Sequence, residues 1–316
     1  MNIIAFHSRL LEDQFRTGCY ESAIARLVRP GDVVVDIGTG TGILALFACR
    51  AGARKVYAIE VGAEIELARL IACANGLQHQ ITFISKMSMD VCLPERADVL
   101  ITETGGTFGL QGGMLGAVID GRRRFLKENG RILPSCLDLW VAPVEFPKGY
   151  EAVETWKRGL YGFDFSVIRT FAANNDHASW DLDAHHLLGE GQLLTHIVFR
   201  EMEDTYVQGR VSFQINKAGV LQGFAGWQST EVATGITFTN SPVHPTIRWK
   251  RSFLPVECPC PVFAGDEVTL VITTNNGAEW RWRGNVTNRH GEEKAQFDQC
   301  TFHGFPIIPG ALKPKQ

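Results

Sequence analysis

The stretch VVVDIGTGTGILALFACRAGARKVYAIE, residues 33–60, decides the fold of this chain. It opens on Val33, Val34 and Val35, an apolar β-branched run that predicts a strand buried on both faces of a parallel sheet. After a glycine-rich turn, residues 43–48 are apolar and compatible with a helix, and a second apolar run covers residues 56–59. The stretch therefore predicts a strand, a turn, a helix and a parallel strand.

The turn holds three glycines, Gly38, Gly40 and Gly42. Glycine lets the backbone turn tightly and lets a ligand approach closely, while the free N–H groups of the following helix face that ligand. Glu60 ends the second strand about twenty residues further on, where a carboxylate can accept hydrogen bonds from both ribose hydroxyls. We expect these four residues to bind a nucleotide cofactor.

Asp36 and the glycine spacing distinguish between cofactors. The spacing is GxGxG, and Ile43 occupies the place of the third glycine of the dinucleotide fingerprint GxGxxG. Asp36 would repel a pyrophosphate but would attract the ammonium and sulfonium groups of S-adenosylmethionine. We therefore predict S-adenosyl-L-methionine as the cofactor, with Asp36 among the residues that bind it. The GxGxG spacing and Asp36 both argue against a nicotinamide oxidoreductase.

Length and composition set broad bounds. The 316 residues are 45% hydrophobic and long enough for two domains, and the net charge of −3 gives no electrostatic case for a nucleic-acid or membrane partner. The apolar run at the start is too short for a signal peptide, no later run has the length of a membrane span, and eight cysteines are scattered without a CxxC pair. We expect a cytoplasmic protein. No metal site is expected, because His185 and His186 lack a supporting acid or cysteine pattern.

The pattern changes near residue 134. Before it, apolar strand runs alternate with helical patterns, which is typical of a doubly wound parallel sheet. After it come alternating runs such as LDLWVAPVEF, THIVFREM, VSFQI, EVTLVITT and EWRWRGNV, which favour antiparallel strands in a barrel or sandwich. In the last run, Trp280 and Trp282 are expected to face the interior. We predict an α/β Rossmann-like domain at 1–134, with an N-terminal helix at 5–29, and an antiparallel domain at 135–316.

Four motifs resemble the protein arginine methyltransferases. They are HSRLLEDQFRTGCY at 7–20, the stretch at 33–60, YGFDFSVIR at 161–169 and SPVHPTIRWKRSFLPV at 241–256. The resemblance implies a Rossmann-like class I methyltransferase domain followed by an antiparallel β-barrel domain with an inserted dimerisation arm at about 156–190. It also implies a head-to-tail homodimer.

The resemblance also implies roles for individual residues. Arg16 would bind the cofactor carboxylate, and Met89, next to Asp90, stands where the family has an adenine-contacting glutamate. Glu103 begins the loop ETGGTFGLQGGML, residues 103–115, which is similar to the loop in which two glutamates clamp a guanidinium. Glu103 is the predicted catalytic residue, because it also ends a parallel strand at the usual ligand edge of such sheets.

The chain departs from the family in this acceptor region. Gly112 takes the place of the second glutamate, with Gln111 beside it, and Arg248 stands where the Thr-His-Trp loop has its histidine. The predicted acceptor-binding residues are Glu103, Gln111, Arg248 and Trp249.

A guanidinium is nearly always protonated and is best held by paired carboxylates. With one carboxylate, a neutral amide, imidazole, amine or hydroxyl becomes as reasonable an acceptor as arginine. We predict an S-adenosylmethionine-dependent methyltransferase that acts on a side-chain nitrogen of a peptide, protein or amino-acid-like substrate. An O- or N-methyltransferase of a small metabolite and a non-catalytic cofactor-binding scaffold remain alternatives.

Overall fold

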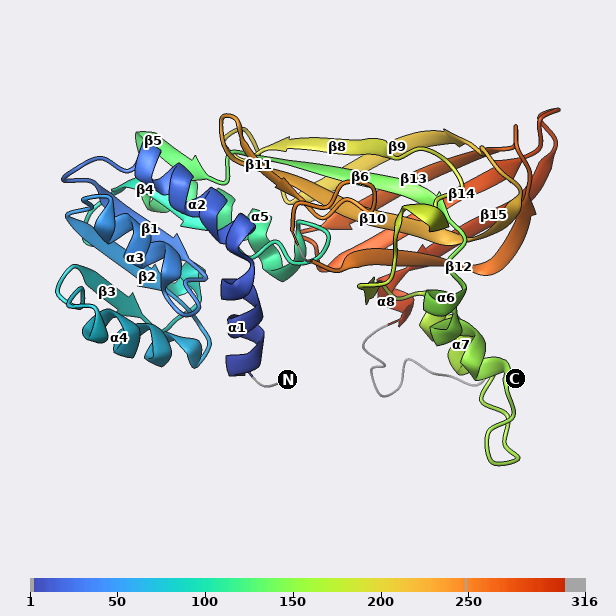
Figure 1. The fold of residues 1–316 in the computed structure, drawn as a ribbon, viewed down its shortest axis with the longest axis horizontal. Helices are drawn as coiled ribbons and strands as arrows, with labels where there is room; N and C mark the ends of the chain where they lie inside the picture. The colour runs from blue at the N-terminus through green and yellow to red at the C-terminus, as the bar shows by residue number, and fades with distance from the viewer. Residues whose placement is uncertain (1–2, 248, 305–316) are drawn as a thin grey trace.

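The computed structural model describes residues 3–247 and 249–304. A parallel sheet with its helices lies beside two antiparallel sheets (Figure 1). The helices are α1 Ile3–Glu12, α2 Gln14–Leu27, α3 Ile43–Arg50, α4 Glu64–Ala74, α5 Met114–Arg124, α6 Pro147–Glu154, α7 Ile168–Ala173 and α8 Thr301–Gly304. The strands are β1 Val33–Ile37, β2 Lys55–Ile59, β3 Ile81–Ile84, β4 Ala97–Thr102, β5 Leu126–Leu133, β6 Cys136–Val144, β7 His177–Ser179, β8 Gln192–Val198, β9 Tyr206–Gln214, β10 Gly219–Ala233, β11 Ile236–Thr239, β12 Arg251–Val262, β13 Glu267–Asn275, β14 Glu279–Thr287 and β15 Glu293–Cys300.

The parallel sheet has the order β3-β2-β1-β4-β5. In β1, Val33 and Val35 belong to the apolar core on the α5 side, whereas Val34 packs with residues of α2 and α3. Both faces of β1 are thus buried, as the valine run predicts, because neighbouring side chains on a strand point to opposite faces. The α/β class and the Rossmann-like order of elements are confirmed.

The N-terminal segment forms two helices where the sequence predicted one at 5–29. The break falls at Asp13, whose side chain accepts a hydrogen bond from the backbone N–H of Arg16 at 3.1 Å. Aspartate favours this capping position over a helix interior, so a new helix begins there. None of the helices within residues 3–247 and 249–304 has the length and apolar character needed to cross a membrane.

Strand β5 was not predicted from the sequence. Its residues 127–129 are polar and exposed, and its buried side chains are confined to Leu126 at the start and to Ile132 and Leu133 at the end. An edge strand of this kind lacks the apolar run that identifies a buried parallel strand. It nevertheless pairs parallel with β4.

The two antiparallel sheets follow Pro134. One has the order β7-β12-β10-β6-β8, with β11 on β10, and the other has the order β15-β14-β13-β9. Phe224 of β10 packs on Phe213 and Phe297 of the second sheet, with ring centroids 6.2 and 5.3 Å apart. Trp280 and Trp282 are buried, as their alternation predicts. The two sheets therefore enclose one apolar core.

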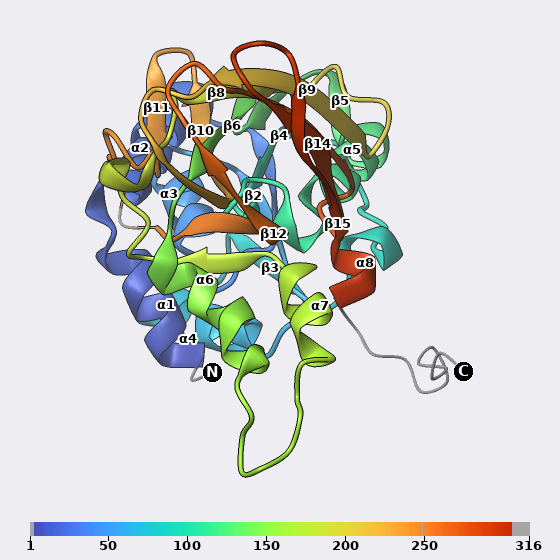
Figure 2. The same ribbon diagram turned by 90° about the vertical axis from the view of Figure 1, so that its right-hand side faces the viewer.

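The segment between α6 and α7 projects away from the antiparallel sheets (Figure 2). The sequence assigned about 156–190 to an arm. However, His177–Ser179 forms β7, which pairs antiparallel with β12 at the edge of the six-stranded sheet. The projecting part is therefore shorter than expected, because backbone pairing returns the chain to the sheet before residue 180.

Candidate active site

A cavity of about 540 Å³ lies where β1, β2 and β4 end. Gly38, Glu60 and Glu103 follow these three strands and all line it. The carboxyl ends of parallel strands are the usual ligand edge of such a sheet. The other lining residues come from α1, α2, the glycine turn, the start of α3, the start of α4, the loop after β4, the end of β7 and residues 249–250, and include His7, Arg16, Tyr20, Thr39, Glu64, Thr107, Ala178, Trp180, Trp249 and Lys250.

The glycine turn forms one wall and requires glycine. Gly40 has a φ of 53°, and a Cβ there would lie 2.9 Å from the His7 ring. Gly38 has a φ of 75°, and a Cβ there would lie 2.4 Å from the methyl group of Thr104. The turn can therefore approach α1 and the loop after β4 only because it carries no side chains at these positions.

The Glu60 carboxylate is held by the backbone. Its Oε2 accepts a hydrogen bond from Gly40 N at 3.1 Å, and its Oε1 accepts one from Gly62 N at 2.9 Å. These bonds fix the carboxylate at the cavity wall, where the sequence expected it to meet a ribose.

Asp36 is buried beneath the turn. Its Oδ2 accepts a hydrogen bond from Thr39 Oγ1 at 2.6 Å, whereas its Oδ1 has no partner among the described residues. Burial raises the pKa of Asp36 to about 7, although the Thr39 hydrogen bond opposes the rise. A buried carboxylate with an unpaired oxygen is costly unless a cation is nearby, so the site fits a positively charged cofactor.

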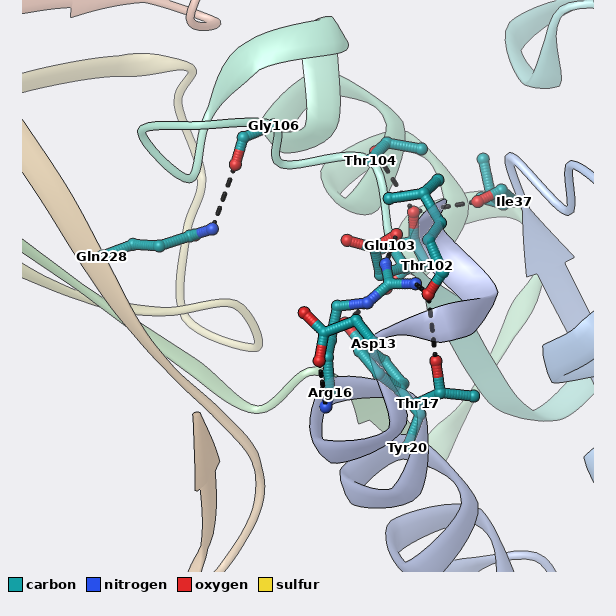
Figure 3. Close-up of polar contacts among 11 residues, drawn as sticks. Asp13, Arg16, Thr17, Tyr20, Ile37, Thr102, Glu103, Thr104, Gly106 and Gln228 are labelled. Atoms are coloured by element: carbon teal, nitrogen blue, oxygen red, sulfur yellow. Dashed lines mark hydrogen bonds and ion pairs between the residues drawn. The ribbon is translucent and has the colours of Figure 1, made fainter. Parts of the chain in front are cut away.

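Arg16 and Glu103 meet in the cavity (Figure 3). Arg16 Nη1 donates to Glu103 Oε2 at 2.6 Å, and Nη2 donates to the Leu10 carbonyl at 2.7 Å. Burial raises the pKa of Glu103, and the Arg16 charge opposes this. The sequence predicted separate partners for these two residues; the structure joins them as an ion pair. Arg16 Nε is buried and has no hydrogen-bond partner among the described residues.

The loop that carries Glu103 is held by contacts along its first half. Thr102 Oγ1 donates to the Ile37 carbonyl at 2.9 Å, and Gln228 Nε2 of β10 donates to the Gly106 carbonyl at 3.0 Å (Figure 3). Further along the loop, Phe108 stacks on Trp280 of β14, with ring centroids 4.8 Å apart. The antiparallel sheets thus set the position of the loop.

Gln111 and Gly112 lie behind the cavity wall rather than in it. Gln111 Oε1 accepts from Thr107 N at 2.7 Å, and Nε2 donates to Asp176 Oδ2 at 3.1 Å. Gly112 has a φ of 71°, and a Cβ there would lie 2.9 Å from the Thr104 carbonyl oxygen. The backbone at Gly112 therefore disfavours any side chain, so the missing glutamate cannot simply be restored there.

The other predicted residues are dispersed. Trp249 lines the cavity, and its ring centroid lies 5.4 Å from the Arg16 guanidinium carbon. Met89, 64% exposed, and Asp90, also exposed, belong to a 3₁₀ turn at Ser88–Asp90 and do not line it. Arg248 lies outside the described residues.

Several lining residues were not predicted. Trp180 and Lys250 meet at the wall, with Lys250 Nζ 5.9 Å from the Trp180 ring. His7 Nε2 lies 3.9 Å from Glu64 Oε1, across the gap between α1 and α4. Within the described parts of the chain, no group of three His, Cys, Asp or Glu residues could hold a metal ion.

Comparisons with known proteins point to one family. Residues 137–290 match the arginine methyltransferase oligomerization subdomain, and residues 17–104 match the ribosomal protein L11 methyltransferase (PrmA). Protein arginine N-methyltransferase 2 of Homo sapiens is 30% identical over 294 residues, which are 88% of this chain and 68% of the relative. Protein arginine N-methyltransferase PRMT10 of Arabidopsis thaliana is 30% identical over 314 residues, 87% of this chain and 81% of the relative.

Solved structures share the fold. The Trypanosoma brucei PRMT1 enzyme-prozyme heterotetrameric complex with AdoHcy has a TM-score of 0.81 at 22% identity and covers 93% of this chain and 96% of its own. Arabidopsis thaliana protein arginine methyltransferase 10, described in a uniquely open conformation, has a TM-score of 0.76 at 26% identity with the same coverage.

Proposed function

Since the chain belongs to the protein arginine N-methyltransferase family and is a methyltransferase that uses S-adenosylmethionine, we propose that it methylates a guanidino nitrogen of arginine in a peptide or protein. The observation that carries this proposal is the Arg16–Glu103 ion pair at the end of β4. Glu103 is the one retained acid of the loop that resembles the guanidinium clamp, and it lines the cavity.

The cofactor side of the cavity fits a cationic ligand. S-adenosylmethionine supplies a methyl group attached to a positively charged sulfur. Asp36 provides a buried negative charge beneath the turn, Glu60 presents a fixed acceptor for ribose hydroxyls, and Arg16, which lines the cavity, offers a positive charge to a carboxylate. The roles of Asp36 and Glu60 are those that the spacing at 33–60 predicts, and the role of Arg16 is the one that the resemblance implies.

On the acceptor side, Glu103 orients the nucleophile. Its Oε2 is taken by Arg16, so its Oε1 remains to accept a hydrogen bond from an N–H of the acceptor. A carboxylate in this position keeps the acceptor nitrogen turned toward the methyl group and offers a place for the proton that must leave it. The fixed loop limits how far this carboxylate can move.

The test is methyl transfer from labelled S-adenosylmethionine to three peptides of one sequence that differ only in a central arginine, lysine or citrulline. We expect label on arginine alone, located by tandem mass spectrometry on the guanidino group. Glu103→Gln is the inactive control. Transfer to the citrulline or lysine peptide, or to none, would contradict the proposal. The same assay separates the arginine proposal from the small-metabolite and scaffold alternatives, because both alternatives predict no label on any of the peptides.

We also propose a head-to-tail homodimer. The matched oligomerization subdomain supports assembly, and apolar side chains stand exposed on the projecting segment: Tyr161 is 95% exposed, Phe163 70% and Val167 70%. Exposed apolar clusters mark surfaces that bind another protein. Light scattering at micromolar concentration should give a dimer for the unmodified chain and a monomer for Tyr161→Ser with Phe163→Ser. These substitutions spare β7, which a larger deletion of the arm would remove.

Two finer features are part of the same proposal. The packing of β8 on β9 and of β12 on β15 supports closure of the two antiparallel sheets into a barrel. The eight free cysteines support the predicted cytoplasmic location, since a reducing compartment keeps thiols free.

A further inference from the structure

A second acid, the half-buried Asp176, lies behind the loop that carries Glu103. Its Oδ2 accepts hydrogen bonds from Gln111 Nε2 at 3.1 Å and from Ser252 Oγ at 3.0 Å. Its Oδ1 is buried and has no partner among the described residues. Burial raises the pKa of Asp176 to about 6, and the two neutral partners oppose the rise. An acid buried in this way has one oxygen left over for a donor.

Asp176 adjoins the cavity from the side of β7. It directly precedes this strand, and side chains two residues apart on an extended chain share a face. Ala178 and Trp180, two and four residues further on, both line the cavity. Ser252, which bonds to Asp176, is the register partner of Ala178. Asp176 therefore lies beside this wall, and its carboxylate is not among the groups that line the cavity.

Gln111 connects Asp176 to the opposite side of the wall. Its Oε1 accepts from Thr107 N at 2.7 Å, and Thr107 and Gly106 line the cavity. The chain of contacts Thr107–Gln111–Asp176–Ser252 therefore ties the loop after β4 to β12. A change of charge at Asp176 would reach the acceptor site through this chain of contacts.

The balance of charges on the acceptor side of the cavity favours a further acid near it. Glu103 is neutralised by Arg16, and Lys250 adds a further positive charge to the wall. The other described lining carboxylates, Glu60 and Glu64, follow β2 and begin α4, so on the acceptor side a guanidinium would meet only the paired Glu103, and burying it there is costly. Gly112, the position of the family's second acid, disfavours a side chain. Asp176 is the nearby buried carboxylate that has an unused oxygen.

We propose that Asp176 is the second acid of the acceptor site, a positioning residue that holds the cavity wall through Gln111 and balances the charge of a cationic acceptor. The inference rests on the proposed arginine acceptor and adds to it the residue that replaces the absent glutamate. Asp176 directly precedes β7, whereas the absent glutamate would stand in the loop after β4.

The test compares Asp176→Asn with the unmodified protein on the arginine peptide at pH 8. We expect KM to rise about tenfold or more, with kcat and the affinity for S-adenosylhomocysteine changed less than about threefold. Below about pH 6 the KM of the unmodified protein should rise toward that of the variant, because Asp176 becomes protonated. Ser252→Ala, which removes one hydrogen bond and keeps the charge, is the matched control and should change KM by less than about threefold.

A purely structural role would lower the melting temperature and kcat together and would leave the KM ratio independent of pH; that result overturns the inference. An unchanged KM in a folded Asp176→Asn variant overturns it as well, while the proposed function stands. If the unmodified protein does not methylate the arginine peptide, the proposed function fails first and this inference fails with it. If Asp176→Asn does not fold, Asp176→Ala is measured instead, and its KM for the arginine peptide should rise in the same way.

Discussion

The cofactor side and the acceptor side of the cavity are built in different ways. Most of the predicted cofactor ligands come from one continuous stretch, residues 33–60, whose strand ends and glycine turn bring Asp36, Gly40 and Glu60 together, and Arg16 of α2 joins them at the cavity. The acceptor side is assembled from the loop after β4, the end of β7 and residues 249–250. Local spacing therefore describes the first side well, whereas the second depends on contacts between elements far apart in the chain.

Each side nevertheless contains an acid with one buried oxygen that has no partner among the described residues. Asp36 Oδ1 lies beneath the cofactor turn, and Asp176 Oδ1 lies behind the acceptor loop. Burial raises the pKa of both, to about 7 and about 6. The parallel indicates that each side stores a negative charge for a cationic ligand, at a cost to the stability of the free protein.

The largest effect should come from Glu103→Gln, which removes the charge on the acceptor side and keeps an amide oxygen that can accept from Arg16. Loss of a positioned carboxylate should lower turnover of the arginine peptide by about two to four orders of magnitude. The affinity for S-adenosylhomocysteine, measured by calorimetry, should change by less than about threefold, because Asp36 and Glu60 are untouched. A matching fall in cofactor affinity would show that the two sides are not separable.

Glu60→Ala should break the cofactor side instead. Two hydrogen bonds from ribose hydroxyls to a charged acceptor are lost, each worth roughly 1.5–3 kcal/mol, so the cofactor affinity should fall about a hundredfold or more. Glu64→Ala, another carboxylate of the cavity, is the control and should have a small effect. Equal affinities for Glu60→Ala and the unmodified protein would remove the support for the assigned role of Glu60.

A third effect concerns the pH dependence of stability that comes from Asp36. Its folded pKa, about 7, lies above the ordinary value, so the folded protein keeps a proton that the unfolded chain has released. Stability of the free protein should therefore fall as pH rises from about 4 to about 7, by roughly 4 kcal/mol at most. Asp36→Asn should lack this loss and be the more stable protein at pH 8, as measured by urea unfolding.

Cofactor binding should show the opposite trend. A cation pairs with ionised Asp36, so affinity should rise about tenfold from pH 6 to pH 8, in step with the ionised fraction. Asp36→Asn should flatten the profile. An unmodified protein whose affinity does not change across pH 7 would mean that Asp36 does not meet the charge of the cofactor.

Much of the fold was predictable because its signals are local. The valine run of β1, the glycine turn and the alternation of Trp280 and Trp282 follow from the periods of strands and from the needs of a turn. Strand β5 was not predicted because its central residues are polar and exposed. The break at Asp13 was not predicted because a helix cap is a single residue within a longer helical pattern.

The acceptor side was predictable only in part. Glu103 was found because it ends a strand, but its pairing with Arg16 joins positions 87 residues apart, and no sequence period links them. Asp176 lies in a stretch that lacked a strand pattern, so its role behind the acceptor loop could not be inferred without the pairing of β7 with β12. Met89 and Asp90 were placed by resemblance alone, and their contact with the adenine stays a prediction.

The central claim is that the acceptor is recognised as a cation. The most direct measurement is the affinity, by calorimetry at pH 8, of the protein loaded with S-adenosylhomocysteine for an arginine peptide and for the same peptide with citrulline, its neutral isostere. We expect the arginine peptide to bind at least about tenfold more tightly. One charged hydrogen-bonded pair is worth roughly 1.5–3 kcal/mol, and the lower value corresponds to about a tenfold ratio of affinities. Equal affinity for the two peptides, or tighter binding of citrulline, would contradict the claim.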